Sequence, residues 1–329
     1  MRRLFSHLLI LCLLGATACT SHFSSLSEQE KVLLERFRTI RLLQREMASI
    51  LPGFDDPNYI RPLPYYTDSI CYVMDPGADF QEQFAARLVY RDDSLRVYKT
   101  SLPDSIPFHM ETQVDFLDST AFNYWSPYHY CSSPEIVARS VPDVTTDNAW
   151  FPMVLHECAH GYQYAHPWLD ALLAHALPMH GEMELARLHL QYDWFNELIE
   201  VENRAILDAV DADDASDRNS HIRTFLMSRK ARKERMAQEL GEEAVRDEEF
   251  YEYMEGLARY IEAEVGFRLG CYSQEKDTWL FDTNRSGYFF ATGYNLMRLF
   301  DRLGVDKSSL YTDSFRPLED FVREAVNQQ

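Results

Sequence analysis

The chain has 329 residues, of which 46% are apolar and 13% aromatic, and its formal net charge is -20. This length and apolar share can build a sizeable core and exclude a disordered chain. The acidic balance argues against nucleic acid as a partner, because clustered Lys and Arg bind a phosphate backbone. The basic stretch from Arg229 to Arg235 is interrupted by Glu234, so we expect it to be a solvated helix face.

The N-terminus has the features of a bacterial export signal. Two arginines precede the apolar run Leu4–Leu14, which is too short to span a bilayer, and small residues then lead to Cys19. This order is typical of the lipobox of bacterial lipoproteins. We therefore expect residues 1–18 to be a signal peptide, Cys19 to carry a lipid that anchors the chain to the membrane, and residues 19–25 to be a tether. The alternative is an ordinary cleaved signal, because Ala16 stands where lipoboxes prefer Leu.

The next segment is predicted to be a helix followed by a modest sheet. Ser27 and Glu30 form a capping box, and apolar residues at three- and four-residue steps continue the helical pattern to Ile50. From about residue 54 to 145, Pro-rich turns alternate with short apolar runs. The runs that we predict to be strands are Ile70–Met74, Ala86–Tyr90 and Leu95–Tyr98.

Helical periodicity returns at Trp150 and persists almost to the C-terminus. Gly and Pro signals predict turns within this half. They lie at Pro167, Pro178, Asp211–Asp217 and Gly304. Because no linker or repeat interrupts the pattern, residues 26–329 are predicted to form one domain.

Four cysteines follow Cys19, and they permit up to two disulfides whose pairing the sequence does not choose. They are Cys71, Cys131, Cys158 and Cys271. None has CxxC spacing, so we expect neither a cysteine-built zinc site nor a catalytic cysteine.

The pattern HExxH is formed by His156, Glu157 and His160. Four residues are slightly more than one helical turn, so both imidazoles can reach a single Zn²⁺ from one face of a helix. We predict this helix at about residues 150–165, with Pro152 near its start. Glu157 lies beside the first histidine and is the predicted general base for a metal-activated water.

A catalytic zinc usually has a third protein ligand, and the chain offers two kinds of candidate. Glu182 and Glu184 follow His160 at about the separation known from thermolysin-like enzymes. Glu255 is much further along the chain, in the segment Glu-Gly-Leu-Ala-Arg-Tyr. Sequence distance favours the first pair, and local sequence favours Glu255.

The segments HECAHGYQ and EGLARYIE together resemble the gluzincin clan of zinc metallopeptidases, many of which pair HExxH with a distant EGxAxY motif. The resemblance covers roughly residues 150–303. It implies a zincin-like α+β fold, His156, His160 and Glu255 as zinc ligands, and Glu157 as the base. A long helical insertion, at about residues 168–250, separates the two motifs.

Further residues near the motifs are candidates for supporting roles. Glu262 lies two helical turns after Glu255, where it either accepts a hydrogen bond from a ligand histidine or is solvated. Gln163 either orients a ligand or caps the cleft. The resemblance implies a tyrosine that stabilises the oxyanion, with Tyr294 or Tyr288 as candidates and packing as the alternative.

Four more histidines follow the motif without a repeated ligand spacing, so we expect structural or exposed roles rather than a second metal site. They are His166, His175, His180 and His189.

The sequence thus predicts an α+β, zincin-like protein with a small N-terminal sheet and a mainly helical C-terminal part. Its predicted activity is zinc-dependent hydrolysis of a peptide or protein substrate, on the periplasmic or the cell-surface side of a bacterial membrane. One alternative is a non-catalytic surface binding module that holds a structural zinc. Another is a hydrolase of a different amide, such as a cell-wall cross-link.

Overall fold

The computed structural model describes residues 26–166, 178–284, 287–311 and 315–328. The predicted signal peptide, Cys19 and the tether lie outside these residues, as do Pro167 and His175. The contacts divide the chain into two compact units. One comprises the chain up to Gln44 together with Arg61–Asp147, and the other comprises Arg45–Ile60 together with Asn148–Gln329.

No linker-like sequence marks this division. The chain first passes between the units after Gln44, inside the helix Glu28–Met47. It passes back after Ile60, and then again after Asp147, at the start of the helix Asp147–Tyr164. The predicted pattern changes from helix to strands near residue 54 and back to helix near Trp150, but no linker accompanies either change, which is why the sequence predicts one domain from residue 26 onward.

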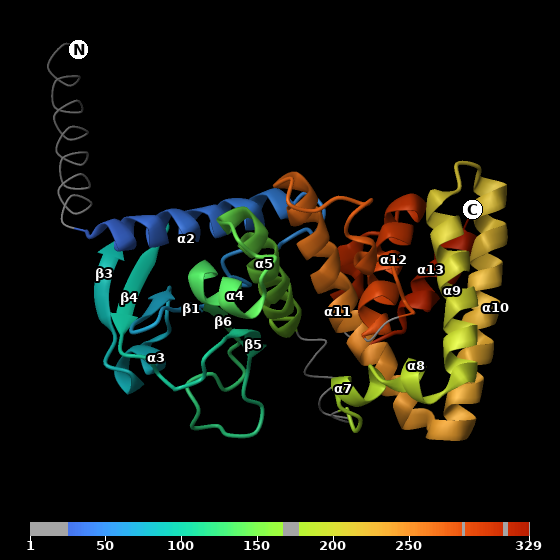
Figure 1. The fold of residues 1–329 in the computed structure, drawn as a ribbon, viewed down its shortest axis with the longest axis horizontal. Helices are drawn as coiled ribbons and strands as arrows, with labels where there is room; N and C mark the ends of the chain where they lie inside the picture. Colours follow the sequence, from blue (N-terminus) through green and yellow to red (C-terminus); the bar gives the residue numbers. More distant parts are fainter. Residues whose placement is uncertain (1–25, 167–177, 285–286, 312–314, 329) are drawn as a thin grey trace, which may run out of the picture. The chain divides into compact units, whose positions relative to one another are not determined.

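The first unit contains a six-stranded mixed sheet in the order β3-β4-β2-β1-β6-β5 (Figure 1). Its strands are β1 (Leu63–Tyr66), β2 (Cys71–Met74), β3 (Arg87–Arg91), β4 (Arg96–Thr100), β5 (Met110–Gln113) and β6 (Tyr128–Ser132). β1 and β6 run parallel, with Tyr65 opposite Cys131, and the other pairs are antiparallel. The short helices α3 (Ala78–Gln83) and α4 (Pro134–Ser140) belong to the same unit.

The three strands predicted from sequence are β2, β3 and β4, displaced by one or two residues. The strands β1, β5 and β6 were not predicted from the sequence. Pro64 stands inside β1 and argues against a strand. All five residues of β6 are buried although His129 and Ser132 are polar, so this strand is not one of the short apolar runs that were used to predict strands.

The helix α2 (Glu28–Met47) confirms the predicted capping box. The Ser27 hydroxyl accepts from the Glu30 backbone N–H at 3.2 Å, and the Ser27 N–H donates to the Glu30 carboxylate at 3.0 Å. These reciprocal bonds satisfy two of the backbone groups that a helix start leaves open. The apolar positions of the sequence pattern, such as Phe37 and Ile40, are buried.

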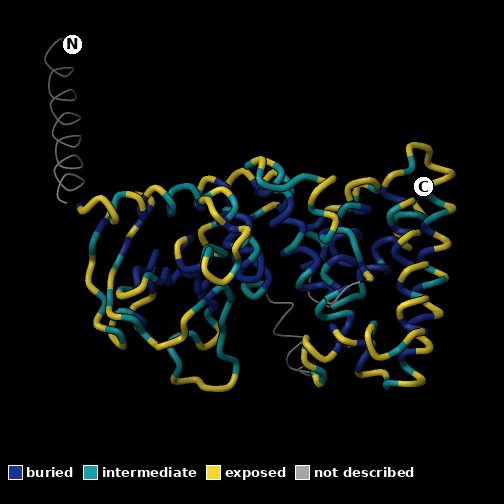
Figure 2. The backbone as a smooth tube through the Cα atoms, in the orientation of Figure 1, coloured by how far each residue is buried: buried dark blue, intermediate teal, exposed yellow. Residues whose placement is uncertain are grey.

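The second unit is helical, and α9 lies beside α10 while α11 packs on α12 (Figure 1). Its helices are α5 (Asp147–Tyr164, from Asn148 onward), α7 (Glu182–Leu185), α8 (Leu188–Gln191), α9 (Asp193–Asp211), α10 (Ala215–Leu240), α11 (Glu242–Arg268), α12 (Tyr288–Leu303) and α13 (Leu318–Asn327). Two 3₁₀ turns, η1 (Thr278–Leu280) and η2 (Lys307–Tyr311), connect them. The predicted turns are confirmed between α9 and α10 and at Gly304, whose φ of 72° ends α12. Figure 2 shows α11 and α12 largely buried and α10 with an exposed face.

The helix α5 begins at Asp147, three residues before the predicted start at about residue 150, so Pro152 lies inside the helix. Proline lacks the N–H that would bond to the carbonyl four residues earlier, that of Asn148. In the structure this carbonyl accepts from the Cys271 thiol at 3.2 Å. A distant cysteine therefore satisfies the group that the proline leaves open.

The prediction of a solvated face from Arg229 to Arg235 is wrong for Arg229 and Arg232, whose side chains are fully buried. Arg229 bonds Glu202 at 2.8 Å and Glu252 at 2.6 Å, and Arg232 bonds Glu202 and Glu248 at 2.7 Å each. Because removing one partner of a buried ion pair leaves an uncompensated charge, this network fixes α9, α10 and α11 to one another. Helical spacing alone could not reveal that these arginines face inward.

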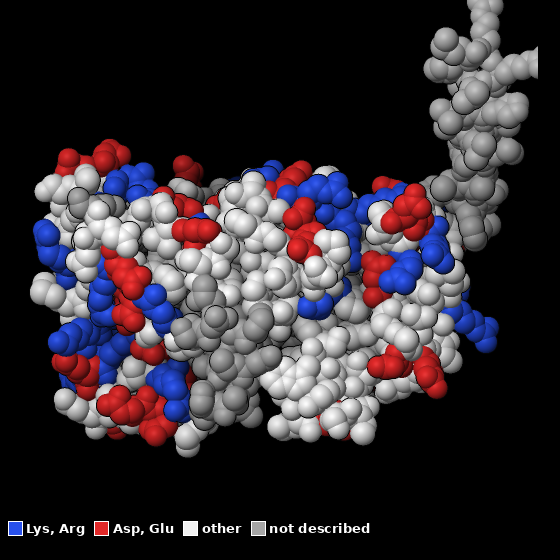
Figure 3. Space-filling view, turned by 180° about the vertical axis from the view of Figure 1, so that it is seen from behind, with Lys and Arg blue, Asp and Glu red and all other residues white. Residues whose placement is uncertain are grey.

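Lys233 is also buried, where it pairs with Glu249 and Glu319. In contrast, Lys230 and Arg235 of the same helix are exposed, as the sequence predicts. Lys230 pairs with Glu234 and Arg235 with Glu239, each one turn apart. On the face of this unit drawn in Figure 3, Lys and Arg are interspersed with Asp and Glu.

The cysteines form no disulfide in the part of the chain that the structure describes, although the sequence permitted two. Among the described helices, none is both long enough and apolar enough to cross a membrane.

Candidate metal centre

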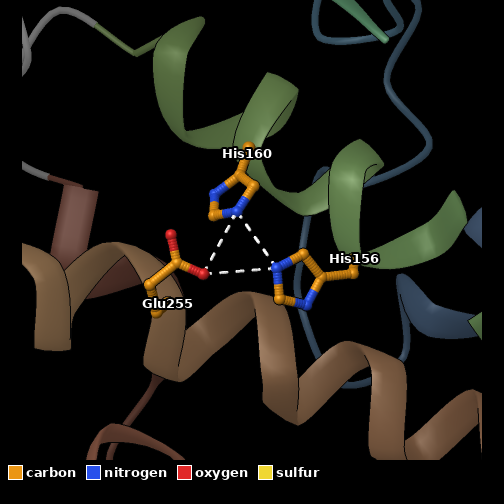
Figure 4. Close-up of side chains that lie close together, drawn as sticks. All are labelled: His156, His160 and Glu255. Carbon is orange, nitrogen blue, oxygen red and sulfur yellow. Dashed lines mark hydrogen bonds and ion pairs between the residues drawn. The ribbon is translucent and has the colours of Figure 1, made fainter. Parts of the chain in front are cut away.

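Two helices that are far apart in the sequence bring three side chains to one point (Figure 4). His156 and His160 come from α5, and Glu255 comes from α11. Their ligand atoms all lie within 4.8 Å of one another. The Glu255 carboxylate lies 3.3 Å from His156 Nε2 and 3.5 Å from His160 Nε2, and the two Nε2 atoms are 3.2 Å apart.

The ring of His156 is oriented by a second carboxylate of α11. Its Nδ1 lies 2.9 Å from Glu262 Oε2, and the Tyr272 hydroxyl donates to Glu262 Oε1 at 2.8 Å. Of the two roles that the sequence left open for Glu262, the structure therefore shows the acceptor role. Such a carboxylate fixes the tautomer of a histidine and raises the basicity of its other nitrogen.

The ring of His160 is oriented by Gln163, one turn later on the same helix. Gln163 Oε1 lies 3.0 Å from His160 Nδ1, while its Nε2 donates to the carbonyls of Tyr253 at 3.3 Å and Met254 at 2.9 Å. The carbonyls can only accept, so they determine which end of the amide faces them. Gln163 thus ties His160 to the backbone immediately before Glu255.

These contacts make the group suitable for a cation. Because Glu262 and the Gln163 oxygen accept hydrogen bonds, each histidine donates from Nδ1 and in its neutral form presents the Nε2 lone pair. Two such lone pairs and a carboxylate oxygen then meet without a donor among them. Two imidazoles and one carboxylate are a ligand set that Zn²⁺ takes in catalytic sites.

The electrostatics of the group agree with this geometry. Burial alone would raise the pKa of Glu255, but the two histidines hold it well below its usual value. Burial would lower the pKa of His156, but hydrogen bonds with Glu255 and Glu262 raise it to about 10. The carboxylates thus give the site a local negative charge, which protons or a metal ion can neutralise.

No family model matches this chain, and comparisons with curated proteins and with solved structures found no match. The interpretation of the site therefore rests on its own side chains.

Neither of the other two candidates for the third ligand belongs to this group. Within the described residues, only His156, His160 and Glu255 form a group that could hold a metal ion. Glu182 is partly buried near this group, since burial and the charge of Glu255 raise its pKa while the histidines lower it. Glu184 is exposed.

Glu157, the predicted base, is buried with only 7% of its surface exposed. Burial lowers the pKa of His160, but the charge and hydrogen bond of Glu255 raise it, and the charge of Glu157 adds a smaller contribution in the same direction. Glu157 therefore lies within electrostatic range of the group, as expected from its place beside His156.

The tyrosines suggested by the sequence have other surroundings. The Tyr288 hydroxyl donates to Glu248 at 2.5 Å and so belongs to the buried ion-pair network. Tyr294 packs against Tyr260 and Phe281. Burial raises the pKa of Tyr294 to about 12, and none of the three grouped residues is among the main causes of this shift.

Tyr164 is a tyrosine that the sequence analysis missed. Burial raises its pKa, and the charges of Glu255 and Glu157 raise it further, so Tyr164 lies within electrostatic range of both carboxylates. The raised pKa keeps the phenol protonated and able to donate at neutral pH. Tyr164 could have been predicted as a site residue from its spacing, because it follows His160 by four residues and lies on the same face of the helix.

Proposed function

We propose that this protein is a zinc-dependent peptidase whose metal ligands are His156, His160 and Glu255. The observation that carries the proposal is the convergence of the two Nε2 atoms and a carboxylate oxygen, with both Nδ1 atoms engaged by Glu262 and Gln163. A glutamate adjacent to the first histidine distinguishes this arrangement from a structural zinc site, which has four protein ligands and needs no base.

Zinc, when bound, supplies Lewis-acid chemistry that acidifies water and polarises a carbonyl. Glu157 takes the proton from the attacking water on its carboxylate and gives it to the nitrogen of the leaving amine. Tyr164 donates its phenolic hydrogen to the oxyanion that develops on the substrate carbonyl. Glu262 and Gln163 keep the two imidazole rings in the orientation that leaves Nε2 available.

The gluzincin resemblance of HECAHGYQ and EGLARYIE supports a peptide bond as the scissile amide and a zincin-like fold as the scaffold. The described architecture is α+β, with a mixed sheet in the first unit and helices in the second. The assignment to zincins remains a proposal, as does a peptide or protein as the substrate.

Metal analysis of the mature chain tests the ligand assignment. We expect about one zinc per chain, and loss of that zinc in His156→Ala and Glu255→Gln. The matched control is Glu184→Gln, which removes the same charge from an exposed residue that the sequence also offered as a ligand. Retention of zinc in Glu255→Gln together with its loss in Glu182→Gln would move the third ligand.

Turnover tests the role of Glu157. The Glu157→Gln variant keeps the size of the side chain but cannot take a proton, so cleavage of a peptide library followed by mass spectrometry should fall by roughly 10²- to 10⁴-fold. Zinc content should be unchanged. Equal cleavage by wild type and variant would reject this residue as the base.

We also propose that the chain is exported and anchored by a lipid on Cys19, on the sequence evidence of the run Leu4–Leu14 and the small residues after it. Radiolabelled palmitate should enter the wild-type chain in a bacterial host and be absent from Cys19→Ser. Secretion of the unmodified wild-type chain into the soluble fraction would instead indicate an ordinary cleaved signal.

A further inference from the structure

One arginine beside the metal centre differs from the buried arginines of its unit. Arg259 lies on α11 one turn after Glu255, and its guanidinium carbon is 4.7 Å from the ring centre of Phe290 and 4.9 Å from that of Trp279. The Phe290 ring also stacks on the imidazole of His156, with ring centres 6.4 Å apart. Helical spacing and the shared phenylalanine both place this guanidinium next to the ligands.

Arg259 has no acceptor for its N–H groups among the residues that the structure describes. Its Nε is buried and has no hydrogen-bond partner, and its terminal nitrogens form neither a hydrogen bond nor an ion pair there. Phe290 and Trp279 present their ring faces to the guanidinium carbon and offer its N–H groups no oxygen or nitrogen acceptor. Burial accordingly lowers the pKa of Arg259.

The lack of an anionic partner distinguishes Arg259 from the two arginines of the buried ion-pair network. Arg229 and Arg232 are fully buried and each bonds two glutamates, whereas Arg259 is partly buried and bonds none among the described residues. The charges of Glu262 and Glu255 partly offset the effect of burial on the pKa of Arg259. Neither carboxylate lies within ion-pair distance of Arg259, and both contact His156 instead. A partly buried cation without an anion is costly, so an anion from outside the chain would relieve that cost.

We propose that Arg259 binds a carboxylate of the substrate, which makes the enzyme selective for peptides that carry a carboxylate close to the scissile bond. This inference rests on the proposed peptidase function. The planar guanidinium presents paired N–H groups that match a carboxylate in a bidentate contact. The carboxylate comes either from the C-terminus of a short peptide or from an acidic side chain next to the cleaved bond, and the two sources have the same chemistry at Arg259.

Small hydroxamates test this subsite by binding rather than by turnover. The probes are acetohydroxamate, which has no carboxylate, succinic monohydroxamate and the carboxamide of the latter. Titration calorimetry on the zinc-loaded protein compares the wild type with Arg259→Gln and Arg259→Lys. We expect the wild type to bind the acid at least about tenfold more tightly than the carboxamide, since charge-assisted hydrogen bonds are the strong ones.

The preference for the acid should disappear in Arg259→Gln and persist in part in Arg259→Lys, which keeps the charge without the planar fork. Acetohydroxamate should bind all three proteins equally, because it reaches only the metal. The matched control is Arg298→Gln. Arg298 also stacks on aromatic rings, at 4.7 Å from the centre of Phe281, but it bonds Asn295 and pairs with Asp211, so its loss should leave the preference intact.

A fourth probe distinguishes the two sources of the carboxylate. It is the carboxamide with a carboxymethyl branch on the carbon beside the amide, which imitates an acidic side chain. Preference for succinic monohydroxamate assigns the C-terminal carboxylate, and preference for the branched probe assigns the acidic side chain.

Two results would overturn the proposal, and only the second would also reject the proposed peptidase function. Equal affinity of the wild type for acid and carboxamide, or a preference that survives in Arg259→Gln, removes the carboxylate subsite while acetohydroxamate binding still supports the metal centre. Absence of both zinc and acetohydroxamate binding rejects the peptidase and the subsite together.

Discussion

Gly256 lies against Gly293 so closely that a Cβ atom added to Gly256 would fall 2.5 Å from the Gly293 Cα. A Cβ atom on Gly293 would lie 2.4 Å from the Glu252 carbonyl oxygen. The helices α11 and α12 therefore cross in backbone contact one residue after the ligand Glu255. This crossing gives a structural reason for the glycine in the segment Glu-Gly-Leu-Ala-Arg-Tyr.

Substitution of either glycine by alanine should destabilise the protein and weaken zinc binding. Alanine is the better helix former by roughly 1 kcal/mol, but the clash is with backbone, so the helices must separate at a cost of about 1–3 kcal/mol or more. Urea unfolding and zinc titration measure the two effects. Gly181→Ala is the control, because nothing lies within 4 Å of its added Cβ. Unchanged stability in Gly256→Ala would refute the close crossing.

Gln163 should act as a positioning residue for the zinc site. In Gln163→Leu, His160 loses its acceptor and α11 loses two bonds to the carbonyls of Tyr253 and Met254, so zinc affinity should fall about 10- to 100-fold. Gln163→Glu keeps the acceptor for His160 but cannot donate to the carbonyls. Competition with a chelator measures both variants. An affinity in Gln163→Glu that lies between those of the wild type and Gln163→Leu would show that both halves of the amide contribute.

Removal of the hydroxyl group should affect kcat at Tyr164 but not at Tyr294. The Tyr164→Phe variant should lower kcat by about 10²-fold with zinc content unchanged, because loss of one hydrogen-bond donor to a developing oxyanion costs this much or more. Tyr294→Phe removes the same hydroxyl from the surroundings formed by Tyr260 and Phe281, and should leave kcat nearly unchanged. The opposite pattern would restore the role that the gluzincin resemblance implies for Tyr294.

The buried network should make stability depend on pH through Glu252. Burial raises the pKa of this carboxyl from 4.5 to about 7, although Arg229 opposes the shift. Among the described residues its Oε2 has no hydrogen-bond partner, which favours the neutral acid. Between pH 4.5 and 7 the folded chain therefore keeps a proton that the unfolded chain has released.

The free energy of unfolding should consequently fall as pH rises through this window, by up to roughly 3 kcal/mol, and become level above pH 7. Carboxyls with lowered pKa, such as Glu319, act in the opposite direction at lower pH. Urea unfolding at pH 5 and pH 7.5 should show a smaller fall in Glu252→Gln than in the wild type. The exposed Glu243→Gln is the control and should retain the wild-type fall. A fall of equal size in Glu252→Gln would assign the pH dependence to other groups.

The spacing of residues along the sequence was enough to predict the features that depend on a single helix. The capping box of Ser27 and Glu30, the turn at Gly304 and the shared face of His156 and His160 all follow from the geometry of a single helix. For the same reason the position of Glu262 relative to Glu255 could be foreseen. Each of these predictions depends on residues that are close in the sequence.

The sequence by itself therefore determined the α+β class, the HExxH pair and the candidates for the third ligand. Only the tertiary structure decided which of those candidates meets the histidines, because Glu255 and Glu182 differ in how α11 and α7 pack rather than in local sequence. It also decided that Arg229 is buried against glutamates while Arg259, on another helix, has no such partner. Helical periodicity fixes which residues share a face, but the partner of that face is fixed by contacts between segments far apart in the chain.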